Sequence, residues 1–198
     1  MKLPRSISRV RAQHILRGDS SGGGHSPRQG KAGKSLFPAD WSDQTILDMI
    51  HEVATDSSSV TRKSRLKRVI CEGVRKGIKI RVVLDRDGTV ITGFPLSRGT
   101  TIAMANDPDL DTATLWEVLS ILKPALAEQD YTDIADFIVA GERGLATDTI
   151  FCAVSEDGIN VDGSTLVKLA SLRNLYNTFG DADPGLAQRV LSRWPHAL

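Results

Sequence analysis

The chain has 198 residues, of which 40% are hydrophobic and 25% are charged. These values are typical of folded globular proteins and argue against a mainly disordered, collagen-like or coiled-coil chain. No stretch approaches the roughly 18 apolar residues of a membrane-spanning helix, so we expect no membrane partner, and the basic N-terminus lacks the apolar run of a secretory signal. Two cysteines far apart in sequence predict neither a disulfide framework nor a zinc site, and favour a reducing compartment.

The near-neutral net charge of +1 conceals two halves of opposite charge. Residues 1–100 carry 19 Lys and Arg against 9 Asp and Glu, a balance of +10, whereas residues 101–198 carry 6 against 15, a balance of −9. A basic domain attracts a phosphate backbone, and an acidic domain beside it could occupy the same surface. The alternative is two unrelated domains with different surface charge.

In the first half, residues 18–35 are rich in Gly, Ser and basic residues and read as a loop. Ser42 opens a predicted helix whose apolar positions recur at helical spacing and which fades by residues 56–59. Residues 61–76 fit a helix or a strand broken near Gly73. Alternation predicts a strand over 78–82, Asp87-Gly88 a turn, and residues 89–94 a returning strand.

The charge switch coincides with a polar, irregular stretch that includes Met104. We therefore expect an α+β domain over residues 1–98 (helix plus antiparallel β-sheet), a linker over 99–106, and an all-α helical-bundle domain over 107–198. Five helices are predicted there: one capped by Asp111 and disturbed by Pro124, then helices within 130–139, 145–154, 164–179 and beyond Pro184.

Among the four histidines, His14 and His25 lie eleven residues apart around the triple glycine Gly22–Gly24, within the basic half. Two imidazoles can act as an acid/base pair in a reaction for which RNA supplies its own 2′-hydroxyl nucleophile. Both could instead be surface or packing residues. His51 is interpreted as a half-exposed helix residue, and His196 as exposed.

Three motifs in this order resemble the EndoU family of endoribonucleases, especially its bacterial toxin branch. They are His14–Asp19 followed by Gly22–His25, then Gly33–Ser35 before Phe37–Ser42, and finally Asp87–Pro95. The resemblance covers about residues 10–96. It implies an EndoU-like fold and cleavage to a 2′,3′-cyclic phosphate, at uridylates and possibly on tRNA.

The resemblance also implies roles for individual residues. His25 matches the general base, His14 the general acid and Lys34 the third member of the triad, with Lys31 close enough to be confused with it. Thr92 and Phe94 match residues that line the base pocket. The family usually has tyrosine at the position of Phe94; phenylalanine keeps a stacking face but loses the hydroxyl. Glycines let backbone amides approach a phosphate, which makes Gly23 and Gly24 candidate substrate contacts.

We expect no cofactor, although some relatives respond to Mn²⁺. The acidic half resembles small helical immunity proteins of the MafI-like group over Asp133–Ile138 and Gly141–Ala146. This resemblance implies that the acidic domain binds and neutralises the basic one, as in a toxin–immunity pair. The site of action would be the bacterial cytoplasm, with delivery from outside as part of a larger secreted protein.

Two other interpretations remain open. The chain could be a non-catalytic RNA-binding module whose helical half recruits a partner. Alternatively, the nuclease prediction holds and the acidic half serves dimerisation or delivery.

Overall fold

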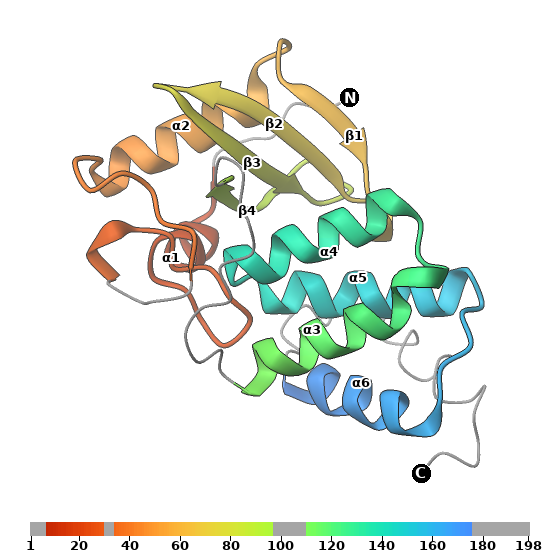
Figure 1. Cartoon of the computed structure of the whole chain (residues 1–198). Helices are drawn as coiled ribbons and strands as arrows, with labels where there is room; N and C mark the ends of the chain where they lie inside the picture. The colour runs from red at the N-terminus through yellow and green to blue at the C-terminus, as the bar shows by residue number, and fades with distance from the viewer. Residues whose placement is uncertain (1–6, 30–33, 97–109, 176–198) are drawn as a thin grey trace. The chain divides into compact units, whose positions relative to one another are not determined.

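The computed structural model describes residues 7–29, 34–96 and 110–175, with side chains as far as Leu172. The chain divides into two compact units, Met1–Ala105 and Asn106–Leu198 (Figure 1). The boundary falls within the predicted linker. Met104, and the helix predicted beyond Pro184, lie outside the described residues.

The first unit begins with helix α1 (Arg9–Arg17), which the sequence patterns did not indicate. The hydroxyl of Ser8 caps the helix by accepting a hydrogen bond from the Arg11 N–H at 3.3 Å. Ile15 and Leu16 are buried, so the helix is anchored by its last turn. Most other positions of α1 are basic or polar. The helix therefore lacks the recurring apolar spacing by which a helix is predicted, and it was missed.

Helix α2 (Asp43–Thr55) is confirmed, with Ser42 as its cap. The Ser42 hydroxyl accepts a hydrogen bond from the Thr45 N–H at 3.0 Å. Ile46, Ile50 and Val53 are fully buried, as their helical spacing predicted. The helix packs against the central strands of the sheet.

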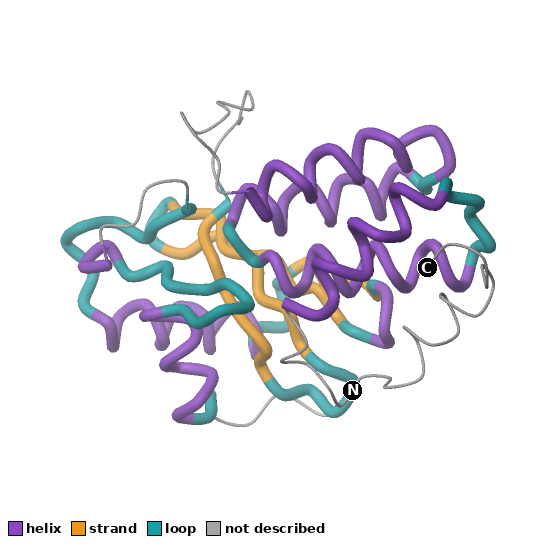
Figure 2. Tube along the Cα trace, turned by 90° about the horizontal axis from the view of Figure 1, so that it is seen from below, coloured by secondary structure: helices purple, strands orange, loops and turns teal. Residues whose placement is uncertain are grey.

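The sheet has four antiparallel strands in the order β1-β2-β3-β4. Its strands are orange in Figure 2. The strands are β1 (Val60–Lys63), β2 (Val69–Arg75), β3 (Ile78–Leu84) and β4 (Val90–Pro95). The segment 61–76, left open between helix and strand, is therefore two strands joined by the short 3₁₀ turn η2 (Arg65–Lys67). Pairing decides the ambiguity, because all seven residues of β2 align with β3, from Val69 opposite Leu84 to Arg75 opposite Ile78.

The predicted turn between β3 and β4 is confirmed. The Asp85 N–H donates to the Thr89 carbonyl at 2.8 Å, and Gly88 has a φ of +85°. The register between β3 and β4 shifts after Val83, so Thr92 lies opposite Val83 whereas Val90 lies opposite Leu84. This bulge changes which side chains of β4 share a face with those of β3.

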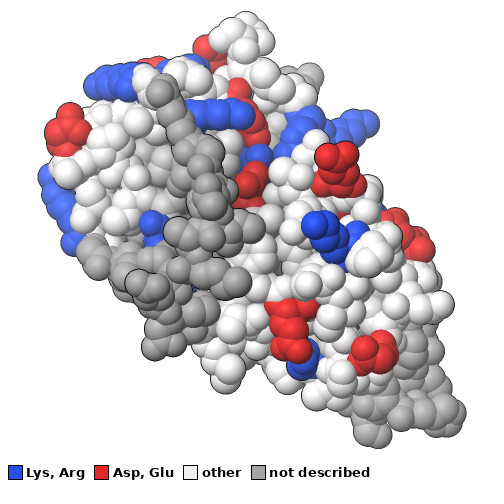
Figure 3. All heavy atoms as spheres, in the orientation of Figure 1, with Lys and Arg blue, Asp and Glu red and all other residues white. Residues whose placement is uncertain are grey.

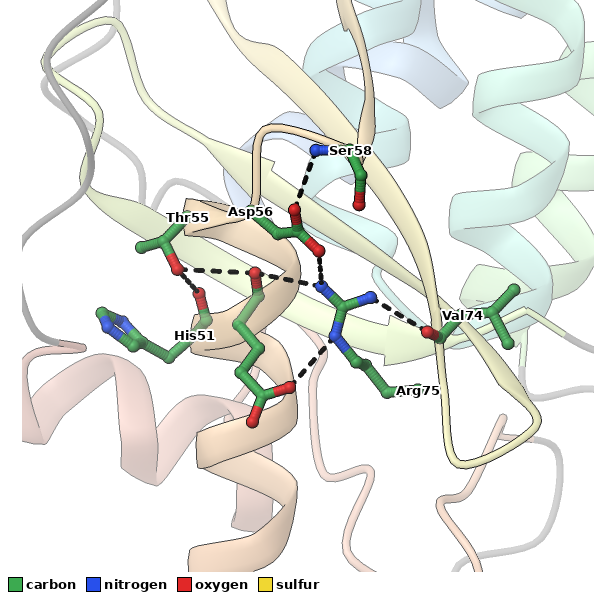
Figure 4. A network of polar contacts seen from close by, with 7 residues as sticks. His51, Thr55, Asp56, Ser58, Val74 and Arg75 are labelled. Atoms are coloured by element: carbon green, nitrogen blue, oxygen red, sulfur yellow. Dashed lines mark hydrogen bonds and ion pairs between the residues drawn. The ribbon is translucent and has the colours of Figure 1, made fainter.

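Arg75 joins the end of α2 to the hairpin between β2 and β3 (Figure 4). Its guanidinium donates to Glu52 Oε2 at 3.1 Å and to Asp56 Oδ2 at 2.6 Å. A third nitrogen, Nη1, donates to the Val74 carbonyl at 2.9 Å. The pKa of Asp56 is lowered by hydrogen bonds from Ser58 and by Arg75. The Arg75 side chain therefore links the end of α2 to the hairpin between β2 and β3, although β1 and β2 lie between them in sequence.

The second unit is helical in its described part. It contains α3 (Leu110–Leu122), η3 (Lys123–Ala125), α4 (Glu128–Ala140), α5 (Arg143–Glu156) and α6 (Gly163–Leu175). Pro124 ends α3 as predicted, but Asp111 lies in the first turn of the helix and is not its cap. Helix α3 contacts α4, α5 and α6. None of the described helices is long and apolar enough to span a bilayer.

Helix α5 is buried from Gly144 to Ser155. The buried set in this unit includes ionisable side chains as well as apolar ones, namely Asp133, Glu142 and Asp148. Cys71 in the first unit and Cys152 in the second are both free and buried. Burial raises the pKa of the Cys71 thiol, which makes that sulfur a poor nucleophile.

Candidate active site

The loop after α1 folds back onto the last turn of that helix. The Gly24 N–H donates to the His14 carbonyl at 2.9 Å, and the His25 N–H donates to the Ile15 carbonyl at 2.8 Å. The Ser26 N–H donates to the Leu16 carbonyl at 3.3 Å. The bonds to Ile15 and Leu16 satisfy carbonyls that the helix end leaves without intrahelical partners, and all three bonds bring the backbone of His25 against the turn that carries His14.

Gly23 is required for this close approach. Its φ is +68°, and a Cβ atom there would lie 2.1 Å from the His14 carbonyl oxygen and 3.1 Å from Cδ2 of the His14 ring. No other residue type fits without moving the backbone. The glycines considered as phosphate contacts therefore have a structural role here, since the Gly24 N–H is directed at the His14 carbonyl.

His14 is oriented by Asp19. Nδ1 of His14 donates to Asp19 Oδ2 at 2.9 Å, and the other oxygen of Asp19 accepts from the Ser21 N–H and hydroxyl at 2.8 and 2.6 Å. Partial burial would raise the pKa of Asp19, but hydrogen bonds from His14 and Ser21 together hold it well below its usual range. A carboxylate at this distance favours the imidazolium form of its partner, and this form can donate a proton.

His25 is held differently. Its Nδ1 lies 2.9 Å from the carbonyl oxygen of Ser35. Because a carbonyl only accepts, Nδ1 carries the proton, and in the neutral ring Nε2 is then the basic nitrogen. The ring centroid lies 5.6 Å from that of Phe94. The two histidines thus have opposite kinds of partner, one anionic and one neutral.

Lys34 lies beside the same loop. Its Nζ donates to the carbonyl of Gly23, the residue that packs closely against the His14 carbonyl. The structure therefore gathers His14, Gly23 and Lys34 around one peptide, two residues before His25. Lys31, the alternative to Lys34, lies outside the described residues.

Thr92 and Phe94 lie on β4 and are fully buried. They share a sheet face with their partners on β3, Val83 and Arg81, whereas Gly93 lies on the opposite face against Ile50 of α2. The contact between Phe94 and His25 connects this face to the histidine loop. Thr92 and Phe94 thus occupy positions beside the site, on the side away from α2.

An ion cluster lies on the same face of the sheet. Arg81 donates from Nε and Nη2 to Glu72 Oε1 at 2.9 and 2.6 Å, and Lys79 Nζ lies 2.7 Å from Glu72 Oε2. Burial would raise the pKa of Glu72, but the bond from Lys79 and the charge of Arg81 lower it. Two cations therefore share one carboxylate near Phe94, which leaves this region positive.

Asp43, in the first turn of α2, binds residues on both sides of the loop that carries His25. Its carboxylate accepts from Arg17 Nη2 at 2.6 Å and from the Ser26 hydroxyl at 2.8 Å, with Arg28 Nη1 at 3.5 Å. Ser26 directly follows His25 and precedes the short 3₁₀ helix η1 (Pro27–Gln29). The loop is thus tied both to α1 and to α2.

Both imidazoles are buried, His14 at 2% and His25 at 0% exposure. A phosphodiester therefore reaches them only after the covering groups move. His51, by contrast, is on α2 as predicted, and it is exposed there where half-exposure was expected. Among the described residues, no group of three or more His, Cys, Asp and Glu side chains could hold a metal ion.

Sequence reasoning named the histidines, Lys34, Thr92 and Phe94, but it did not assign roles to Asp19, Ser35 or Asp43. Asp19 lies at the end of the first motif, five residues after His14 and between the turn-forming residues Gly18 and Ser21. A carboxylate in a turn at this spacing could have been proposed as a partner of the histidine. Ser35 acts through its backbone carbonyl, which every residue type has, so the residue type could not predict this contact.

Residues 18–97 match the model of a family described as bacterial EndoU nuclease. This segment contains His25, Lys34, Thr92 and Phe94, and it begins four residues after His14. No curated protein and no solved structure matches the chain. The first unit is thus similar to these nucleases over its loop, α2 and sheet, and the match covers less than half of the chain.

Proposed function

We propose that the first unit is an endoribonuclease that cleaves RNA by transphosphorylation, and that the acidic helical part binds and neutralises it. The observation that carries this proposal is that a folded-back loop brings His25 against the turn of α1 that carries His14, and that each imidazole has an orienting partner. The family match supports the same class of reaction. The substrate would be single-stranded RNA, with uridylate and tRNA as the candidates to test first.

In the proposed reaction, Nε2 of His25 removes the proton from the 2′-hydroxyl. The 2′-oxygen then attacks phosphorus, and the bond from phosphorus to the 5′-oxygen breaks. His14, as imidazolium, donates its Nε2 proton to that leaving oxygen. The products are a 2′,3′-cyclic phosphate and a 5′-hydroxyl, and the proton balance is closed by exchange between the two imidazoles and water.

Lys34 supplies positive charge near the loop and would stabilise the developing charge on phosphorus. Asp19 is a positioning residue, because it contacts His14 and not the substrate. Thr92 and Phe94 would contact the base, with the Phe94 ring offering a stacking face. The scheme needs no metal, and we propose cleavage in its absence.

The neutralising role of the second unit rests on charge. The balance of −9 over residues 101–198 opposes the balance of +10 over residues 1–100. Complementary charge favours association and would exclude a polyanionic substrate from the same surface. In the face drawn in Figure 3, Asp and Glu side chains are prominent on the helical unit, and Lys and Arg side chains mark the margin of the first unit. Such a pair would act in a bacterial cytoplasm.

The burial of both histidines favours a second candidate, a non-catalytic RNA-binding module. In such a module the same contacts would only stiffen the loop. The nuclease would create new RNA ends, whereas the binding module would not. One experiment therefore distinguishes the two candidates.

Residues 1–103 and the full chain are each incubated with a uridine-containing RNA in EDTA, and the new ends are analysed for cyclic phosphate. Cleavage by the fragment alone supports both parts of the proposal. Equal cleavage by both supports the nuclease and removes the neutralising role. A folded fragment that binds RNA without cutting it supports the binding module.

The two substitutions are made in whichever chain cleaves RNA, the fragment or the full chain. His14→Ala and His25→Ala should each lower the cleavage rate by at least about 100-fold, the lower bound for general acid–base catalysis. His51→Ala is the matched control, since that histidine is exposed on α2. Wild-type rates in both the His14 and the His25 variant would refute the mechanism.

A further inference from the structure

A single carboxylate, that of Asp43, contacts a chain neighbour of each histidine of the site. Its Oδ2 accepts from Arg17 Nη2 at 2.6 Å, and Arg17 lies three residues after His14 on α1. Its Oδ1 accepts from the Ser26 hydroxyl at 2.8 Å, and Ser26 directly follows His25. The two oxygens of one side chain thus hold the segments that carry the proposed acid and the proposed base.

The contact with Arg17 acts on the turn of α1 that carries His14. Residues three positions apart on an α-helix are neighbours on one face, so Arg17 and His14 share a face of α1. The Arg17 and Asp43 side chains are both partly buried. A hydrogen bond between two charged groups is roughly twice as strong as a neutral one. The ion pair therefore holds the last turn of α1 to the first turn of α2.

The contact with Ser26 acts on the backbone next to His25. Ser26 is fully buried, and its hydroxyl donates to Asp43. The carbonyl of His25 accepts from the Phe37 N–H at 3.0 Å, and its ring is bonded to the Ser35 carbonyl at 2.9 Å. The base is thus attached to the segment that leads into α2, and its chain neighbour is attached to α2 itself.

The separation of the two imidazoles therefore depends on how the end of α1 is fixed to the start of α2. A general acid and a general base must each lie within hydrogen-bond reach of the oxygen that they serve. A misplacement of about 1 Å can lower the rate about 100-fold, even when the substituted residue lies away from the reacting atoms. A link between the two helices at this point would thus affect the rate of the reaction as well as the stability of the fold.

We propose that Asp43 is a positioning residue that fixes the distance between the general acid His14 and the general base His25. It acts through Arg17 on the first and through Ser26 on the second. This inference rests on the proposed function. It predicts that the three side chains of the link work as one group, so that loss of any member releases both histidines from their common support.

The first measurement uses the full chain with isotope-labelled histidine. The proton on His25 Nδ1 is bonded to the Ser35 carbonyl, so its exchange with water reports how firmly the ring is held. Ser26→Ala and Asp43→Ala should each speed this exchange by about tenfold or more, which corresponds to loss of a hydrogen bond to a charged group. Exchange of the Val82 amide, in the middle of β3, reports global unfolding and should change less.

Asp48→Asn is the matched control for this measurement. Asp48 is exposed on the same helix, where its carboxylate accepts from the Gln44 side chain at 2.8 Å. The substitution should leave exchange at His25 unchanged. If Asp43→Ala does not fold, Ser26→Ala carries the test by itself. Wild-type exchange at His25 in the folded Ser26 variant overturns the proposal.

The second measurement compares kcat in whichever chain cleaves RNA, for Arg17→Met, Ser26→Ala and the double variant. Saturating RNA is used, so that a weaker attraction from the lost charge of Arg17 does not enter. Each single substitution should lower kcat by about tenfold or more. The double variant should be no slower than the slower single variant, because the link through Asp43 is already broken. Losses in kcat that multiply would show two independent contacts and overturn the link.

The two measurements separate this inference from the proposed function. Faster exchange at His25 in a chain that never cuts RNA would retain the link between the helices and reject the nuclease. Cleavage with wild-type kcat in both single variants would retain the nuclease and reject the positioning role of Asp43.

Discussion

Asp19 is the residue on which the orientation of His14 depends. It holds Nδ1 of the ring, and its second oxygen is fixed by Ser21. The ring therefore presents Nε2 in one direction, and the carboxylate stabilises its protonated form. By contrast, His25 depends on a backbone carbonyl, which no single substitution at Ser35 removes.

Asp19→Asn should lower the cleavage rate of the active fragment by about 10- to 100-fold, less than loss of the acid itself. The amide keeps a hydrogen bond but loses the charge that favours the imidazolium. Asp40→Asn, at an exposed position before α2, is the control. The measurement is the pH–rate profile, whose limb for the acid should move to lower pH. An unchanged profile would contradict the positioning role.

The same residue makes stability depend on pH. Its pKa is lowered in the folded chain despite partial burial, so the unfolded chain binds the proton first as pH falls. The contribution is therefore complete above the ordinary aspartate pKa of about 4 and is lost progressively below it. The difference in Tm between wild type and Asp19→Asn should shrink as pH is lowered below that value.

At the scale of elements, the first unit depends on the packing of α2 against the sheet. Gly93 shows how close this packing is, because a Cβ atom there would lie 2.8 Å from the Ile50 side chain. Arg75 adds a polar clamp at the end of α2. These Arg75 contacts share no residue with the contacts of His14 and His25 described above, so the two can be separated by experiment.

Arg75→Ala should lower the free energy of unfolding by about 1 kcal/mol, because it removes several hydrogen bonds whose carboxylate partners are partly exposed. Urea denaturation measures this. The cleavage rate of the folded protein should stay unchanged. Arg86→Ala, in the exposed turn between β3 and β4, is the control and should have no effect. A loss of activity without a loss of stability would show that Arg75 belongs to the site.

At the scale of the whole molecule, opposite charge over the two halves is the main feature. Association driven by charge weakens as salt is raised, because screening shortens the range of the interaction. The burial of ionisable groups such as Asp133 and Asp148 adds a further constraint, since buried carboxylates need partners. The dependence on salt therefore tests the proposed neutralisation, whereas these buried carboxylates belong to the interior of the helical unit.

Residues 107–198, added as a separate chain, should inhibit RNA cleavage by residues 1–103, and this inhibition should weaken at higher salt. The control is the cleavage rate of the fragment alone at each salt concentration, because RNA binding is itself salt dependent. Inhibition that does not change with salt would contradict an electrostatic mechanism. No inhibition at any salt concentration would favour a dimerisation or delivery role.

Much of the fold was predictable because its signals are local. The cap at Ser42, the helical spacing of Ile46 and Ile50, and the Asp87-Gly88 turn each act within a few residues. Helix α1 was missed because its buried apolar residues, Ile15 and Leu16, are confined to one turn. The segment 61–76 could not be assigned because its periodicity fits two structures, and only pairing with β3 distinguishes them.

For the candidate site, the sequence determined which side chains are available: two histidines, a lysine and a glycine-rich loop. Only the tertiary structure decided how they are held. Asp19 reaches His14 because the loop reverses, and Ser35 reaches His25 through a carbonyl that every residue type possesses. Contacts made by the backbone, and contacts formed by chain reversal, depend on geometry between distant residues, which local patterns of residue type do not carry.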